Sequence, residues 1–120
     1  MATIFHIASA AAWQEAARRG TYEADSLSSE GFIHCSDRDQ VIRVANARFR
    51  NRHDLVMLQI DTARLEASVR YENLEGGDEP FPHVYGPLPI GAVVQAQPFP
   101  PNAAGGFDDD QLAGFVEAAR

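Results

Sequence analysis

The apolar segments of this chain are all short, and that limits its possible folds more than any other feature. The clearest is Leu55–Ile60, a run that is typical of a buried strand. Other short segments rich in β-branched and aromatic residues lie at 3–8, 31–35, 69–71, 83–85 and 90–97. Because a membrane-spanning helix needs about 20 consecutive apolar residues, we expect a packed domain of short strands without membrane association.

Two helices are expected between the early strands. Ser9 is a suitable N-cap for a helix over 10–19, and Ser36 for a second helix over 37–50. The intervening stretch YEADSLSSEG is polar and predicts turns. The order is therefore βαβαβ followed mainly by strands, which is typical of the α+β class.

The chain of 120 residues has the length of one domain. We expect a single α+β domain over 1–99 and a linker over 100–107, where proline and glycine gather. A C-terminal helix is expected over 108–120, because Asp108 and Gln111 resemble a capping box. Since a helix this short is marginal alone, it should pack on the domain.

Cys35 is the only cysteine, so no internal disulfide can form. The opening residues lack the basic segment of a signal peptide, and His6 interrupts their apolar run. These features favour a cytoplasmic location. By strand alternation Cys35 points away from His34 and Ser36, which suggests a small core residue rather than a nucleophile.

Charge argues against nucleic-acid binding. The net charge is −7, and beyond residue 70 there are eight acids against Arg120 alone, so DNA binding is not expected. The second helix places Arg48 on its apolar arc, where it either snorkels at the helix edge or enters a cleft. Arg43 and Arg50 face the opposite way. A small phosphate-bearing ligand stays compatible with these arginines.

Three histidines, His6, His34 and His83, lie on or beside predicted strand ends. They indicate either one polar pocket or three separate, hydrogen-bonded core positions. No metal is expected, because paired ligands two to four residues apart are missing from the sequence. Serine–histidine hydrolysis through Ser26 or Ser36 is not favoured either, because the sequence has no GxSxG elbow.

A third hypothesis, beside a metal site and serine–histidine hydrolysis, is that these residues bind the nicotinamide ribose of NAD. His6, His34 and Ser36 could contact its hydroxyl groups, while a carboxylate assists cleavage of the glycosidic bond. The candidate carboxylates are Glu30, Glu72 and Glu79.

Four stretches, IFHIASAAAW, DSLSSEGFIHCS, LVMLQID and FPHVYGPLP, resemble the motifs of a small bacterial family named DUF952, a domain of unknown function. The resemblance runs from about Thr3 to Phe99 and implies an ADP-ribosyltransferase-like fold, with packed sheets and a cleft that holds NAD in active relatives. It also implies a similarity to RNA 2'-phosphotransferases, in which His6 matches one motif and His34 with Ser36 another. Segment 90–97 holds Gln95 but lacks the late-strand glutamate of many transferases.

The hypothesis that follows is a cleft that binds NAD or a related nucleotide, with ADP-ribosyl transfer or hydrolysis as its chemistry. His34 and Glu79 are the catalytic candidates, and the ligand-binding candidates are His6, Ser36, Arg48, His83 and Tyr85. In this hypothesis Tyr85 stacks on a base and Arg48 meets phosphate. The alternative is a non-catalytic binding or interaction module, of unknown protein partner, in which the histidines form a structural network.

Overall fold

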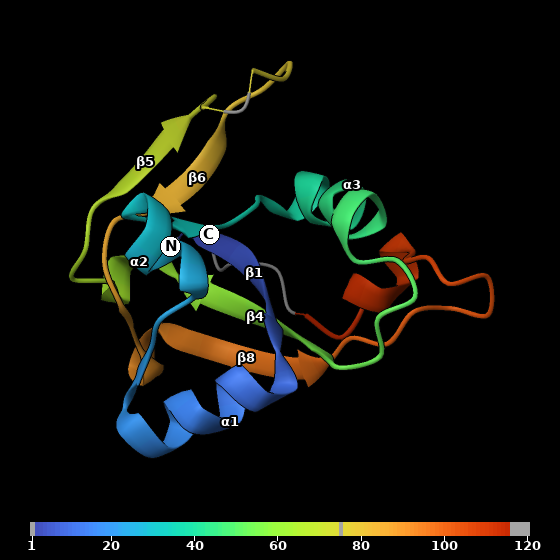
Figure 1. Cartoon of the computed structure of the whole chain (residues 1–120), viewed down its shortest axis with the longest axis horizontal. Coiled ribbons are helices and arrows are strands. Elements are labelled where there is room, and N and C mark those ends of the chain that lie inside the picture. The colour runs from blue at the N-terminus through green and yellow to red at the C-terminus, as the bar shows by residue number, and fades with distance from the viewer. Residues whose placement is uncertain (1, 75, 116–120) are drawn as a thin grey trace.

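The structure, a computed structural model, describes residues 2–74 and 76–115, and it is a mixed α+β fold built on antiparallel sheets (Figure 1). The first sheet has the order β1–β4–β8, with strands Thr3–Ser9, Leu55–Asp61 and Val93–Pro98. The second has the order β3–β6–β5, with strands Ile33–His34, Phe81–Val84 and Val69–Glu72. A short ribbon pairs β2 (Thr21–Tyr22) with β7 (Leu88–Pro89).

Helices connect and cover these sheets. The α-helices are α1 (Ala10–Arg19), α2 (Asp25–Glu30) and α3 (Arg38–Arg48). Three 3₁₀ turns are η1 (Thr62–Arg64), η2 (Ile90–Ala92) and η3 (Asp109–Leu112). None of the helices in the described part of the chain has the length and apolarity to cross a membrane.

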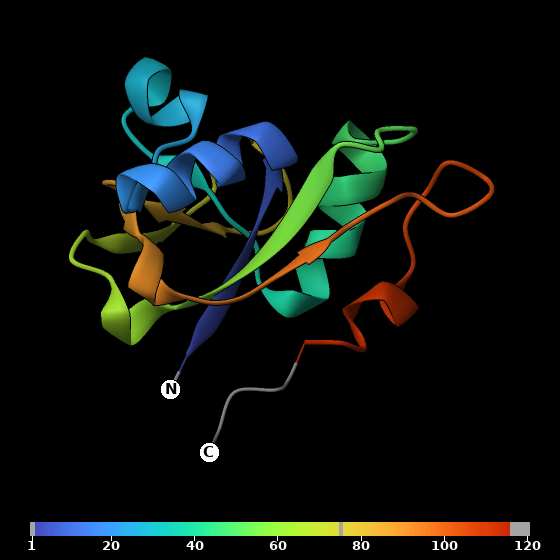
Figure 2. The ribbon, with the colours of Figure 1, turned by 90° about the horizontal axis from the view of Figure 1, so that it is seen from below.

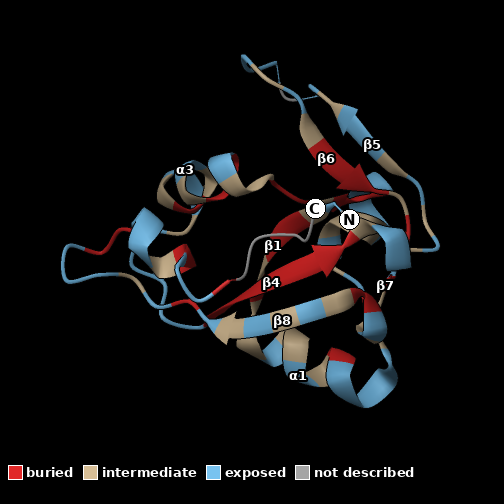
Figure 3. Cartoon of the chain, turned by 180° about the vertical axis from the view of Figure 1, so that it is seen from behind, coloured by how far each residue is buried: buried red, intermediate tan, exposed pale blue. Residues whose placement is uncertain are grey.

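Strand β4 is the centre of the first sheet, and all seven of its residues are buried (Figure 3). It lies between β1 and β8, and its cross-strand partners include Ile4, opposite Ile60. The alternation of a strand divides the core between the two faces of this sheet. Ile4 belongs to one hydrophobic cluster and Phe5 to the other.

A backbone bridge joins β1 of the first sheet to the segment that follows β3 of the second. The backbone amide of Phe5 in β1 donates to the Ser36 carbonyl at 2.7 Å, and the Ser36 amide donates back to Phe5 at 2.8 Å. This antiparallel bridge fixes the segment that follows β3 beside β1, while α3 continues from that segment along the first sheet (Figure 2).

Helix α2 was not expected, because the stretch 22–31 predicted turns. DSLSSE forms the helix without any buried residue, so it lacks the apolar periodicity by which helices are recognised in a sequence. It ends at Gly31, whose φ of 89° is readily adopted only by glycine. The described residues before β4 thus form three α-helices rather than the two that the sequence predicted.

Helix α3 begins one residue later than predicted. Its N-cap is Asp37, whose amide donates to Gln40 Oε1 at 2.9 Å, whereas Ser36 takes part in the bridge to Phe5. The backbone of Ser36 is therefore extended, in the pairing of a strand, and the role predicted for it as the cap was wrong.

The segment expected as a linker, 100–107, is a loop that contacts α3. Asn46 Nδ2 donates to the Phe107 carbonyl at 3.0 Å, and the Phe107 amide donates to Asn46 Oδ1 at 2.8 Å. Beyond it, only the 3₁₀ turn Asp109–Leu112 is helical among the described residues of the predicted helix 108–120, and residues 116–120 of that helix lie outside the described part. Phe115 packs edge-on against Phe5, with ring centroids 5.6 Å apart.

A candidate anion-binding cleft

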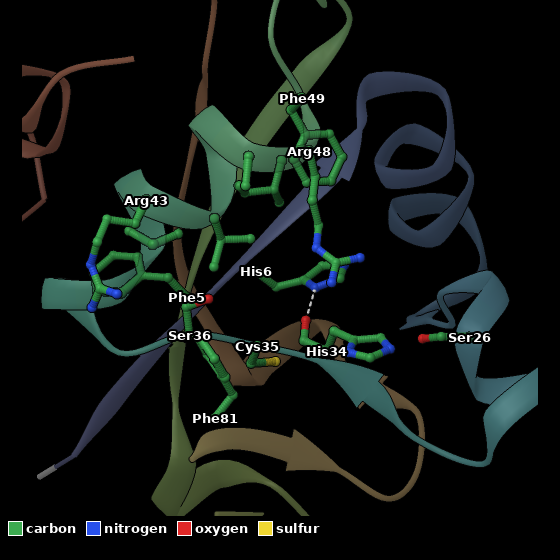
Figure 4. Close-up of a pocket in the computed structure, with 14 residues that line it drawn as sticks. Phe5, His6, Ser26, His34, Cys35, Ser36, Arg43, Arg48, Phe49 and Phe81 are labelled. Atoms are coloured by element: carbon green, nitrogen blue, oxygen red, sulfur yellow. Dashed lines mark hydrogen bonds between the residues drawn. The ribbon is translucent and has the colours of Figure 1, made fainter. Parts of the chain in front are cut away.

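A cleft of about 470 Å³ lies between α3 and the junction of the two sheets (Figure 4). This size is within the range of small-molecule sites, roughly 300–1,000 Å³. Helix α3 and its C-cap supply six lining residues: Val41, Arg43, Val44, Ala47, Arg48 and Phe49. The sheets and α2 supply the others: Phe5, His6, Ile7, Ser26, His34, Cys35, Ser36 and Phe81.

The charged residues that line the cleft are arginines, although the net charge of the chain is −7. Among the described residues that line it, none is Asp or Glu, whereas two are arginines and two are histidines. The rest of the lining is mainly aliphatic and aromatic, including Phe49 and Phe81. An apolar cavity with a few convergent cationic groups is suited to a small ligand that carries an anionic group.

His6 is buried, and both of its ring nitrogens have partners. Nδ1 lies 2.6 Å from the backbone carbonyl of His34, so it must carry the proton, and Nε2 accepts from the Tyr22 hydroxyl at 2.8 Å. Burial lowers the pKa of His6 to about 4, although the bond to the His34 carbonyl acts in the other direction. His6 is therefore a neutral ring that joins β1 to β2 and β3.

His34 is the more accessible histidine of the cleft. Its Nε2 lies 3.1 Å from Glu30 Oε2, at the end of α2, and its side chain is 37% exposed. Strand β3 sets its position, because His34 pairs with His83 across the β3–β6 register. Its ring therefore combines a carboxylate partner with access to the cleft, which suits contact with ligand hydroxyl or phosphate groups.

Cys35 and Ser36 line the cleft but are nearly inaccessible. Cys35 is 4% exposed, and burial raises the pKa of its thiol, so it is not a thiolate nucleophile. Ser26, on α2, uses its hydroxyl to donate to the Phe32 carbonyl at 2.7 Å. These groups support the chain path rather than offer reactive atoms.

Arg43 enters the cleft lining although helical geometry predicted that it would face away. It pairs with Glu79, with 2.6 Å between Nη1 and Oε2, and it is exposed. A helical arc gives only the direction of Cβ, whereas the long side chain of arginine can turn along the helix edge. Glu79, a predicted catalytic residue, lies outside the lining and holds Arg43.

Arg48 lies in the lining, and in Figure 4 its side chain extends from α3 toward the side of the cleft where His6 and His34 lie. Phe49 follows it as the C-cap of α3. The structure thus brings His6, His34, Ser36 and Arg48 of the predicted set to one cleft. The aromatic lining was missed, because Phe5, Phe49 and Phe81 had the pattern of ordinary core residues.

His83 and Tyr85, predicted to bind ligand, lie outside this lining and meet at Glu72 instead. His83 Nδ1 is 3.1 Å from Glu72 Oε1, and the Tyr85 hydroxyl donates to the same oxygen at 2.5 Å. The Tyr85 hydroxyl and the His83 ring together hold the pKa of Glu72 below its ordinary value. Arg70 lies over the face of Tyr85, 4.7 Å from the ring centroid, which is the face that base stacking would use.

Among the described residues, no three His, Cys, Asp or Glu side chains are placed to hold a metal ion together. The cleft combines apolar side chains with two arginines and two histidines. Its cationic groups come from α3, and its neutral and accessible histidines come from β1 and β3.

Comparison with known proteins places the chain among relatives whose role is not defined. Residues 7–96 match the model of a family described as "Protein of unknown function (DUF952)". The crystal structure of protein CC0527 from Caulobacter crescentus is similar, with 32% sequence identity, a TM-score of 0.83 and coverage of 93% of this chain and 99% of that one. The solution NMR structure of CC0527 agrees, with a TM-score of 0.81, 32% identity and coverage of 94% and 98%. Among curated proteins, none matches significantly.

Proposed function

This chain belongs to the DUF952 family, and we propose that its cleft binds a small phosphate-bearing nucleotide, with NAD as the first ligand to test. One observation carries the proposal. In a chain of net charge −7, the described lining of a 470 Å³ cleft contains two arginines and two histidines and no carboxylate. The guanidinium groups of Arg43 and Arg48 attract anions that the rest of the surface repels.

The residues of the cleft suggest how a nucleotide would lie in it. Arg43 and Arg48 would contact phosphate oxygens, because guanidinium groups bind phosphate through paired hydrogen bonds. His34 is the group suited to ribose hydroxyls, since it is accessible and oriented by Glu30. The base would pack against Phe49 or Phe81, which take the place proposed from the sequence for Tyr85.

The proposal also includes the ADP-ribosyltransferase-like fold and activity that the resemblance implies. Two antiparallel sheets that meet at Phe5 and Ser36 beside a cleft are compatible with an ADP-ribosyltransferase-like fold. ADP-ribosyl transfer or hydrolysis would need a carboxylate beside the ribose, and Glu30, bound to His34, is better placed for this than Glu79. Binding is the part of the proposal that the geometry supports best. A cytoplasmic location also stays part of it, since Cys35 is a free thiol.

The second candidate is a module without a small-molecule ligand, whose histidines are architectural. The bonds of His6 to Tyr22 and of His83 to Glu72 favour it, because both rings are buried among protein partners. The two candidates differ at His34 and the arginines, which are accessible in the cleft and contribute to binding only in the first.

An NMR titration with NAD, ADP-ribose and AMP tests the proposal. We expect saturable shifts at His34, and a loss of about tenfold in affinity in His34→Ala, the size of one hydrogen bond to a charged group. The matched control is His53→Ala, since His53 is exposed and outside the cleft. If millimolar concentrations of all three ligands leave the His34 resonances unmoved, the architectural candidate replaces the nucleotide site.

A further inference from the structure

The contact of Arg43 with Glu79 has the form of an occupied anion site. Arg43 Nη1 donates to Glu79 Oε2 at 2.6 Å, and Gln40 Nε2 donates to the other oxygen, Oε1, at 2.9 Å. Both carboxylate oxygens are therefore bound, one by a guanidinium and one by an amide. The hydrogen bonds from Arg43 and Gln40 lower the pKa of Glu79, which keeps it an anion.

The two donors differ in how firmly they are held. Gln40 is 4% exposed, its Oε1 accepts from the Asp37 amide, and its Nε2 also donates to the Pro80 carbonyl at 2.9 Å. Arg43 is 61% exposed and lines the cleft. Glu79 can thus keep its bond to Gln40 while the Arg43 guanidinium turns to another anion.

We infer that the Glu79 carboxylate is an internal competitor for the ligand anion at Arg43, and that the cleft therefore selects phosphate-bearing ligands over neutral ones. The inference rests on the proposed function, because it concerns the same cleft. A carboxylate and a phosphate group offer similar pairs of oxygens to a guanidinium, but a terminal phosphate carries more negative charge. It can displace Glu79 from Arg43, whereas a neutral nucleoside has nothing with which to replace that carboxylate.

Replacement of Glu79 by another anion at Arg43 should not destabilise the fold, because the ion pair is exposed. Pairs of this kind are screened by water and salt and contribute little to stability. Exchange of one anion for another at Arg43 therefore leaves the fold intact. The competition lowers ligand affinity instead, and this reduction should disappear when Glu79 is neutralised.

Isothermal titration with AMP, adenosine and inorganic phosphate tests the inference on the wild type, Glu79→Gln, Arg43→Gln and the double variant. We expect Glu79→Gln to bind AMP about fivefold more tightly, the range of an exposed ion pair. Arg43→Gln should bind AMP about tenfold more weakly, through loss of a charge-assisted contact. Adenosine should be bound equally by all four proteins, and in the double variant the Glu79 change should add nothing.

Matched controls come from α1, where Glu15 and Arg18 form an exposed pair with the same 2.6 Å separation. Glu15→Gln changes the net charge by the same amount as Glu79→Gln, and it should leave AMP affinity within about twofold of the wild type. A general effect of charge would instead strengthen binding in both variants and would overturn the inference.

The outcomes separate this inference from the proposed function. If the wild type binds AMP and Glu79→Gln binds it no more tightly, competition by Glu79 is refuted while the nucleotide site stands. If the nucleotides fail to bind but Glu79→Gln gains inorganic phosphate at Arg43, the anion site stands and the nucleotide proposal fails. If none of the four proteins binds any probe, both are refuted.

Discussion

Two neighbouring groups of histidine and aromatic side chains lie at the paired strands β3 and β6, and they differ in the partners of their polar atoms. In the cleft, His34 and the arginines of α3 border an open volume of about 470 Å³. In the Glu72 network, formed by Glu72, His83 and Tyr85, the polar atoms bond to one another. Phe32 contacts both groups, with ring centroids 4.9 Å from His34 and 4.3 Å from His83, and the His34 and His83 rings themselves lie 5.5 Å apart.

This difference shows that belonging to one sequence motif does not place residues in one site. His83 and Tyr85 belong to the stretch FPHVYGPLP, and they fasten β5 to β6 through Glu72. We therefore expect the Glu72 network to contribute mainly to stability and the cleft mainly to binding. Four changes test that division, from the largest expected effect to the smallest.

Phe32→Ala should have the largest effect, because this ring packs against both regions. Phe32 is 7% exposed, and truncating a buried phenylalanine costs about 4 kcal/mol in free energy of unfolding. The measurement is chemical denaturation of the variant and the wild type. Since the ring also supports His34, AMP affinity should fall as well. If the variant loses stability but binds AMP normally, AMP binding in the cleft does not depend on Phe32.

His83→Ala should separate stability from binding. His83 is 2% exposed, so the substitution removes buried ring contacts and a partner of Glu72, at a cost of about 3 kcal/mol. Denaturation measures that loss, and AMP affinity of the folded variant should stay within about threefold of the wild type. A tenfold loss of affinity would show that His83 contributes to binding and would contradict the division between the two groups.

Acid should destabilise the protein through His6, the cleft residue whose two ring nitrogens both have hydrogen-bond partners in the protein. Its pKa is lowered from 6.5 to about 4 by burial. Between these values the unfolded chain binds a proton that the folded chain does not, so the free energy of unfolding falls as pH falls. From pH 6.5 to pH 5 the loss should be about 1.6 kcal/mol, because the slope starts at half of its full value and rises toward about 1.4 kcal/mol per pH unit.

Denaturation at several pH values measures this slope. His6→Gln should flatten it, while His53→Ala, at an exposed position, should leave it unchanged. A wild-type slope that survives in His6→Gln would mean that another group takes up the proton.

Tyr22→Phe should have the smallest effect. It removes only the hydroxyl that donates to His6 Nε2 at 2.8 Å, which should cost about 1 kcal/mol in denaturation. AMP affinity should not change, since Tyr22 lies outside the cleft lining. A clear change in affinity would show that the His6 bonds set the geometry of His34, whose carbonyl accepts from His6.

Local pattern was sufficient to predict much of the fold. The strand predicted at 55–60 is β4, the helix predicted over 10–19 is α1, and Gly20 ends it with a φ of 90°. These elements have strong periodicity or capping signals that depend only on near neighbours in the chain. Helix α2 lacks such signals, because none of its six residues is fully buried and Leu27 is its one apolar side chain, and it was missed.

The sequence by itself determined the α+β class, the burial of Cys35 and the placement of His6, His34 and His83 on strands. Tertiary structure alone decided that both ring nitrogens of His6 bond to protein groups while His34 is accessible in the cleft. The reason is the distance along the chain between partners, 28 residues for His6 and His34 and 36 for Arg43 and Glu79. Periodicity shows the face of an element on which a residue lies, but the partner on that face is set by how the sheets and α3 pack.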